Sequence, residues 1–210
     1  NVLKSKDGKY IIFNTNLLNK FFQDIYIIAE VHAAEDSEVY MKPIRTSKES
    51  YAELRRYGFE GMVPEPPKFF DDVNEVIFNT SWMIDKNYDS LTHIIEQRKD
   101  RFPANMREQN PYTLARKLYD AIDYAVAIAQ RNYKYIVPIY YPKFDRISFL
   151  MPIFLDGTYN TSPDFALVLQ TDAENEIYIT RTILDLETGY QDARLVAKPD
   201  ESWLNPVTLK

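Results

Sequence analysis

The segment Tyr135–Leu184 reads YIVPIYYPKFDRISFLMPIFLDGTYNTSPDFALVLQTDAENEIYITRTIL and decides the fold class. It holds four runs rich in β-branched and aromatic residues, at 135–141, 146–155, 165–170 and 176–184. The connections between these runs are too short for a crossover helix, so neighbouring strands must run antiparallel. The second and third runs are almost continuously apolar, which is typical of strands buried on both faces. The segment therefore predicts an antiparallel meander with a centre covered from two sides.

A long amphipathic helix is predicted just before this meander. Asn110-Pro111 is a favourable helix start, with Asn as the N-cap and Pro at the first helical position. Apolar residues then recur every three or four positions as far as Arg131, and they are Leu114, Leu118, Ile122, Ala125 and Ala129. The predicted fold class is thus α+β: a mainly antiparallel sheet, a meander over residues 135–184, with the helix 111–131 packed on it.

The first half of the chain is less regular. Residues 9–15 and 25–31 are predicted strands, and Val76–Asn79 is a third. Prolines interrupt the stretch 33–72, which we expect to be loop apart from a short helix at 47–57. A further helix is predicted at 88–99, followed by the helix 111–131 already described, and a last one at 185–196. We expect one domain over residues 1–210, and because the chain lacks an initiator methionine, we expect it to be excised from a longer protein.

Composition excludes several classes of site. Five glycines stand in no phosphate-binding motif, the chain has no cysteine, and its two histidines cannot supply a histidine-rich metal centre. We therefore expect no metal and no cofactor. A net charge of −6 argues against non-specific binding to nucleic acid, although a local basic patch is compatible with it. No apolar run is long enough to cross a bilayer, so we expect no membrane partner and a cytoplasmic location.

Two basic segments are candidate binding sites. Arg101 lies in the first, Arg98–Pro103, which suits an anion site, while the structural alternative is a set of cations at a helix C-terminus. His93, earlier on the same predicted helix, is a candidate general base or a structural histidine. The second segment, 131–143, interleaves cations with aromatic rings, as a base-stacking surface requires, although tyrosines are also common in ordinary cores. Its candidate residues are Arg131, Tyr133, Tyr140 and Tyr141.

Arg181 interrupts the apolar face of the last predicted strand, where a charge needs a carboxylate, carbonyl groups or a bound anion. Asn14 and Asn79 end two similar runs, Ile11–Thr15 and Val76–Thr80, and serve there either as turn residues or as a paired binding motif. We expect at least three members of one set to line a single concave surface; the set is Asn14, Arg101, Arg131, Arg181 and Arg194. The alternative is an ordinary salt bridge from Arg181 to Asp185 or Glu187.

The order of short motifs along nearly the whole chain resembles one family, catalogued as domain of unknown function 3825. These motifs are Phe13-Asn14-Thr15, His93-Ile94-Ile95, Arg101-Phe102-Pro103, Arg131-Asn132-Tyr133-Lys134, Val137-Pro138 with Tyr140-Tyr141, Leu150-Met151-Pro152, Phe165-Ala166-Leu167-Val168, Thr182-Ile183-Leu184, Asp192-Ala193-Arg194-Leu195 and Trp203-Leu204. Asn16 departs from the family pattern, which has Gly at this position. The resemblance implies a single domain with a polar site and occurrence beside RNA-associated modules, and it implies no particular reaction.

The function expected from these features is recognition or processing of single-stranded RNA or of a nucleotide, through a polar site of Arg, Tyr and Asn side chains. Two alternatives belong to other classes. One is a sensor or hydrolase domain that binds a small molecule, and the other is a regulatory or interaction module without catalytic activity. No arrangement of residues in the sequence specifies an enzyme mechanism.

Overall fold

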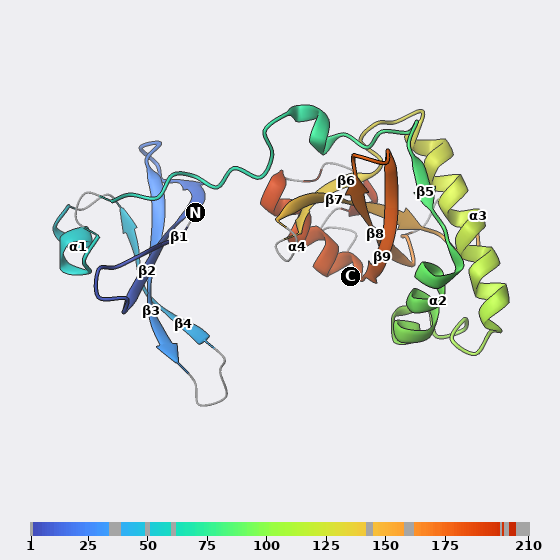
Figure 1. Cartoon of the computed structure of the whole chain (residues 1–210), viewed down its shortest axis with the longest axis horizontal. Coiled ribbons are helices and arrows are strands. Elements are labelled where there is room, and N and C mark those ends of the chain that lie inside the picture. The colour runs from blue at the N-terminus through green and yellow to red at the C-terminus, as the bar shows by residue number, and fades with distance from the viewer. Residues whose placement is uncertain are drawn as a thin grey trace. The chain divides into compact units, whose positions relative to one another are not determined.

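The computed structural model describes residues 2–33, 39–48, 51–59, 62–141, 145–157, 162–197, 199 and 202–204 (Figure 1). The chain divides into two compact units, Asn1–Lys68 and Phe69–Lys210. Each unit has a sheet and a hydrophobic core of its own. The expectation of one domain over residues 1–210 stays a prediction, and the two units are described separately below.

The first unit is an antiparallel sheet with the strand order β1-β2-β3-β4. Its elements are β1 (Val2–Lys4), β2 (Tyr10–Leu18), β3 (Asp24–Ala33), β4 (Val39–Lys48) and helix α1 (Tyr51–Arg56). The strands predicted at 9–15 and 25–31 are confirmed: the first overlaps the beginning of β2, and the second lies within β3. The predicted helix 47–57 overlaps α1, but residues 47–48 belong to β4 instead, and residues 49–50 lie outside the described part of the chain. The small core of the unit consists of Ile12, Tyr26, Ile28, Leu54 and Phe59.

Strand β4 lies inside the stretch that we predicted to be irregular, so that prediction was wrong. The misleading residue was Pro43, which removes a backbone donor and normally excludes a central strand. Here β4 is at the edge of its sheet, and Pro43 pairs with Ala29 beside a shift of register between Ile28 and Ala29. Proline is tolerated at an edge or a bulge, because no neighbouring strand needs its missing N–H.

The second unit contains the predicted meander. Its five-stranded sheet has the order β5-β9-β8-β7-β6, and the strands are β5 (Met83–Asp85), β6 (Val137–Tyr141), β7 (Arg146–Ile153), β8 (Phe165–Asp172) and β9 (Ile177–Leu184). Strands β6 to β9 pair antiparallel in sequence order, and β5 adds a parallel pair with β9. The α+β class and the mainly antiparallel sheet are confirmed.

The strand predicted at Val76–Asn79 was wrong. Residues Val73–Val76 form a 3-10 helix instead, and the following residues lead without a strand to β5. The start of this helix is a reciprocal capping box: the Asp72 carboxylate accepts from the Asn74 N–H at 2.9 Å, and the Glu75 carboxylate accepts from the Asp72 N–H at 3.0 Å. These polar caps outweigh the strand propensity of the short apolar run that follows.

Helices cover both faces of the sheet (Figure 1). On one face lie α2 (Tyr88–Gln97) and α3 (Pro111–Ala129), and on the other lies α4 (Leu186–Val196). The predicted cap of α3 is present, since the Asn110 side-chain oxygen accepts from the Tyr112 N–H at 2.8 Å. Every residue of the predicted apolar stripe of α3 is buried. Among the described residues, no helix is both long and apolar enough to cross a membrane.

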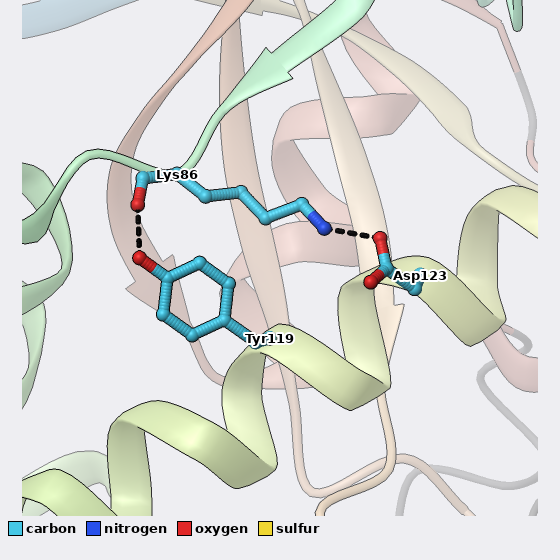
Figure 2. A network of polar contacts seen from close by, with 3 residues as sticks. All are labelled: Lys86, Tyr119 and Asp123. Atoms are coloured by element: carbon cyan, nitrogen blue, oxygen red, sulfur yellow. Dashed lines mark hydrogen bonds and ion pairs between the residues drawn. The ribbon is translucent and has the colours of Figure 1, made fainter.

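A network of polar contacts joins α3 to the residue that follows β5 (Figure 2). The Tyr119 hydroxyl donates to the backbone carbonyl of Lys86, and the Lys86 ammonium group contacts the Asp123 carboxylate. The same ammonium group lies 5.7 Å from the centre of the Tyr119 ring. Three favourable contacts therefore hold the connection between β5 and α2 against the long helix.

Replacement of Leu118 by Ala should lower the free energy of unfolding by about 2–5 kcal/mol, because the side chain is fully buried between α3 and the sheet and leaves a cavity. Chemical denaturation, followed by the fluorescence of Trp82 and Trp203, measures the free energy of unfolding of the second unit. The control Arg116→Ala, at an exposed position of the same helix, should change stability by no more than about 0.5 kcal/mol. Equal effects of the two changes would contradict the described packing of α3.

Candidate functional site

One end of the five-stranded sheet is hollowed by a cavity of about 730 Å³. We call it the sheet-end cavity; it lies where β8 ends and where β7 and β9 begin. Its wall combines the connection before β5, these strand ends and the turn between β8 and β9. The lining residues are Asn74, Glu75, Ile77, Asn79, Trp82, Arg146, Ile147, Phe149, Gln170, Thr171, Asp172, Ala173, Glu174, Tyr178 and Ile179. A space of this size accommodates a small organic molecule.

The cavity has an aromatic wall centred on Tyr178. This residue is only 1% exposed, and its ring stacks on Phe78 with a centroid distance of 4.4 Å. Phe149 contacts it edge to face at 5.6 Å, and Trp82 lies at 5.3 Å with its plane tilted by 38°. Trp82 is only partly buried. Trp82 is therefore the half-buried member of an aromatic cluster whose other rings, Phe78, Phe149 and Tyr178, are buried.

Three side-chain amides in the wall use only part of their hydrogen-bonding capacity. Asn79 accepts from Ser81 through Oδ1, Gln170 accepts from Arg181 through Oε1, and Asn74 donates to Asp72 through Nδ2. Each amide has a second polar atom. Within the described part of the chain, these second atoms, Nδ2 of Asn79, Nε2 of Gln170 and Oδ1 of Asn74, have no side-chain or backbone partner.

The charge of the cavity wall is negative. Glu75, Asp172 and Glu174 oppose the single cation Arg146 among the described lining residues. The Asn175 side chain donates to Asp172 at 2.9 Å and, as the largest cause, lowers the pKa of that carboxyl, so it is ionised at neutral pH. A wall with three carboxylates and one guanidinium disfavours a multiply charged anion inside the cavity.

The hydroxyl of Tyr178 forms a hydrogen bond to a residue that is distant in the sequence. Its oxygen accepts a hydrogen bond of 2.7 Å from the backbone N–H of Asn79. Burial raises the pKa of Tyr178 from 10.0 to about 12, an effect that the Asn79 N–H only partly offsets. The phenol is therefore protonated at any physiological pH.

The structure brings four of the predicted site residues to this end of the sheet. Asn79 lines the cavity, and Arg181 donates through Nε to the lining residue Gln170 at 2.7 Å. Tyr140 and Tyr141 end β6, where they pair with Ile147 and Arg146 of the cavity wall. Tyr140 also donates through its hydroxyl to Asp145, which raises the pKa of the phenol.

The expectation that Arg181 breaks an apolar strand face was wrong, and a β-bulge is the reason. Opposite β9, Val168 pairs with Thr182 and Leu169 with Thr180, so Arg181 is the extra residue. A bulge re-aims the side chain that it carries. Arg181 is exposed and reaches Gln170, so it carries no cost of a buried, unpaired charge.

The other predicted residues of the second unit lie away from the cavity wall. Arg101 donates to the carbonyl of Ile183, near the far end of β9, and Arg131 donates to Ala127 at the end of α3. The guanidinium of Arg194 lies 5.8 Å from the centre of the Tyr190 ring on α4. Tyr133 and His93 are exposed, after α3 and on α2 respectively.

Asn14 belongs to the first unit, where it shapes the β2–β3 hairpin. It is 5% exposed, its Oδ1 accepts from the Asn16 N–H at 2.8 Å, and its Nδ2 donates to the Pro64 carbonyl at 3.5 Å. Asn16 has φ of 59°, in the left-handed region that glycine adopts most easily and asparagine tolerates. These hydrogen bonds to the Asn16 N–H and to the Pro64 carbonyl support the interpretation of Asn14 as a turn residue. The hypothesis that three of the five chosen polar residues line one concave surface stays a prediction.

Sequence reasoning missed Trp82, Arg146, Gln170 and Tyr178 as site residues. Trp82 carried a weak signal, since it is one of only two tryptophans and follows Asn79 closely. The other three stand in regular strands, where neither spacing nor residue type separates a cavity wall from a core. Only the pairing of the strand ends brings them together.

Fold and cavity together define an α+β protein with a cavity at one end of its five-stranded sheet. The chain belongs to the family described as Domain of unknown function (DUF3825), whose family model matches residues 1–203. This match confirms the resemblance to the family that was inferred from the order of the sequence motifs. The searches of curated proteins and of solved structures give no match.

The raised pKa of Tyr178 predicts a specific loss of stability at high pH. The folded protein keeps a proton that the unfolded chain releases above pH 10.0, so this contribution to stability is complete below pH 10.0 and is lost as the pH rises to about 12. The free energy of unfolding of the wild type should fall more steeply across this window than that of Tyr178→Phe. Parallel pH profiles would contradict the buried, protonated phenol.

Proposed function

We propose that the sheet-end cavity binds a nucleobase, carried either by a free nucleoside or by an unpaired nucleotide of single-stranded RNA. The observation that carries the proposal is an aromatic wall combined with side-chain amides that are only partly hydrogen-bonded. Unpaired bases are recognised by this combination, because aromatic faces stack on the base while polar groups bind its edges.

Trp82 is the stacking partner in this proposal. Its indole is partly exposed within the cavity wall, and the tilted contact with Tyr178 limits its motion. A base that stacks on a ring held in place loses little side-chain entropy on binding. The partly used amides of Asn79 and Gln170 then supply donors for the base edge, and Asn74 supplies an acceptor.

Charge decides which part of a nucleotide enters the cavity. Three carboxylates and one guanidinium line the wall, so a phosphate group is repelled while a neutral base is not. Arg181 is exposed and donates to the lining residue Gln170, but it does not itself line the cavity. The acidic total of the chain is compatible with this mode of binding, because it relies on the base and not on many phosphate contacts.

Replacement of Trp82 by Ala should weaken nucleoside binding by about 10-fold to 100-fold, since base–aromatic stacking contributes about 1–3 kcal/mol per base. Isothermal titration calorimetry with adenosine, guanosine, cytidine and uridine, and with a short unstructured RNA, measures the effect. The matched control is Tyr112→Ala, which removes an aromatic ring that is 66% exposed on α3 and outside the cavity wall.

The nucleosides and the RNA together distinguish recognition of a base within RNA from binding of a free small molecule. Binding of both nucleosides and RNA, lost together in Trp82→Ala, supports recognition of a base within RNA. Binding of nucleosides alone supports a sensor of small molecules. Absence of all binding, or equal losses in Trp82→Ala and Tyr112→Ala, would exclude base recognition in this cavity.

Addition of a 5′-phosphate to the preferred nucleoside should lower its affinity, because the wall carries an excess of carboxylates. Titrations of the nucleoside and of its monophosphate at low ionic strength measure this difference, which should shrink as salt screens the charges. Glu174→Gln should reduce the difference in affinity between the nucleoside and its monophosphate. Tighter binding of the monophosphate would instead locate the phosphate at Arg146 and contradict the proposed orientation.

A further inference from the structure

The turn between β2 and β3 gathers four exposed apolar side chains, and we call residues 17–23 the hairpin tip. Leu17 and Leu18 are 60% and 58% exposed, and Phe21 and Phe22 are 60% and 86% exposed. The described core of the first unit contains none of them. Single exposed apolar side chains are ordinary, whereas four of them within six consecutive residues indicate an interaction site.

The hairpin tip is uncovered on both of its faces. Leu17 and Leu18 are the last two residues of β2, and successive residues of a strand point to opposite faces of the sheet. Both side chains are exposed, so neither face of the hairpin is packed at this point. The tip is therefore a projection that can enter an apolar environment, and it is not a groove that receives a ligand.

The backbone of the hairpin tip is hydrogen-bonded within itself. The Asn19 side-chain oxygen accepts from the Phe21 N–H at 2.7 Å and from the Gln23 N–H at 3.2 Å. The Asn19 N–H donates to the Gln23 carbonyl at 2.9 Å, and the Asn19 carbonyl accepts from the Phe22 N–H at 3.0 Å. A segment that enters a bilayer needs internal partners of this kind, because lipid chains offer none.

Phe22 has a backbone conformation that is costly for a bulky residue. Its φ is 59°, in the left-handed region that aromatic residues rarely adopt. The conformation buries no side chain in return, because it leaves the Phe22 ring in solvent. Strained residues of this kind cluster at functional sites, so the strain gives a second and independent indication of a function at the tip.

The charge of the hairpin tip is complementary to the phosphate groups of a lipid surface. Lys20 is the only charged residue from Asn16 to Gln23. Its ammonium group lies 5.1 Å from the centre of the Phe21 ring. A lysine among apolar side chains keeps its ammonium group at the level of the lipid headgroups while its neighbours insert more deeply.

Two other occupants fit the hairpin tip less well. A stable interface between two proteins takes roughly 20–30 residues from each partner, and four apolar side chains are too few for two copies to pair through their tips. Single-stranded RNA requires a row of cations beside the rings on which its bases stack, and the tip has one cation.

We propose that the hairpin tip binds a phospholipid surface, with its four apolar side chains inserted at the interface and Lys20 at the lipid phosphates. The inference goes beyond the proposed function, because it concerns the first unit and does not involve the sheet-end cavity. The expectation of no membrane partner was based on runs long enough to cross a bilayer. A tip that lies in the interface needs no such run.

The test is sedimentation of the full chain with phosphatidylcholine vesicles, whose headgroup carries a phosphate but no net charge. This lipid is chosen because a chain with a charge of −6 is repelled by a strongly anionic surface. The wild type should bind. The double variant with Phe21→Ser and Phe22→Ser should bind about 10-fold more weakly or worse, because it has lost most of the apolar area that leaves water.

The matched control is Tyr112→Ser, which removes an exposed aromatic ring of α3 in the second unit and should bind vesicles like the wild type. Thermal denaturation of each variant shows whether it is folded. Phe22→Trp keeps an aromatic ring and should also bind like the wild type. Vesicles of bromine-labelled lipid should quench the fluorescence of Phe22→Trp more strongly than that of the wild type.

Absence of vesicle binding by the wild type, or equal binding by the double variant, would overturn the inference and favour a protein partner for the tip. Equal quenching of Phe22→Trp and the wild type would contradict insertion of the tip. Binding that is lost in the double variant and kept in Tyr112→Ser, with additional quenching in Phe22→Trp, would support the inference.

Discussion

Burial of β7 and β8 on both faces is the constraint on which the second unit depends. Residues 147–153 and 165–170 are buried without interruption, so each face of these strands needs an apolar cover. Helices α2 and α3 supply one cover and α4 the other. At the end where β7 begins, residues 74–82 form part of the wall instead, in a 3-10 turn and a connection that carry polar side chains. The cavity forms where this polar segment meets the apolar sheet.

The site is assembled from strand ends and a connection, while its rigidity comes from the sheet. Tyr178 stands on β9 in contact with Phe78 and Phe149, and its hydroxyl accepts from the Asn79 N–H, which joins the connection before β5 to the strand. Gln170, on the neighbouring strand, extends the wall to Arg181 through one hydrogen bond. The bulge at Arg181 turns that cation away from the core and toward this partner. A small irregularity in one strand thus leaves in solvent a charge that would have cost stability inside the core.

Expectations from the sequence succeeded where a periodic pattern covered many residues and failed where one residue decided the outcome. The helix 111–131 and the meander 135–184 have long patterns, and both are present. Strand β4 was not predicted because of Pro43. Proline excludes a strand only where a neighbouring strand needs its missing N–H, and the sequence does not show that β4 lies at the edge of its sheet. Of the polar residues chosen from the sequence, Asn79 lines the cavity and Arg181, Tyr140 and Tyr141 adjoin it, while their role in binding stays a prediction.

The amino-acid sequence by itself determined the meander and the α-helices of the second unit, its α+β class and its membership of the DUF3825 family, since these follow from local patterns and from the order of motifs. Only the tertiary structure decided which polar residues share a site. Asn79 and Tyr178 lie 99 positions apart in the chain, and their hydrogen bond exists because β5 pairs with β9. Likewise, the register of β8 against β9 made Arg181 a bulge residue. Hydrophobic periodicity specifies which face of an element is buried, but contacts between strand ends depend on how the elements pair, and the sequence pattern of each element leaves that pairing open.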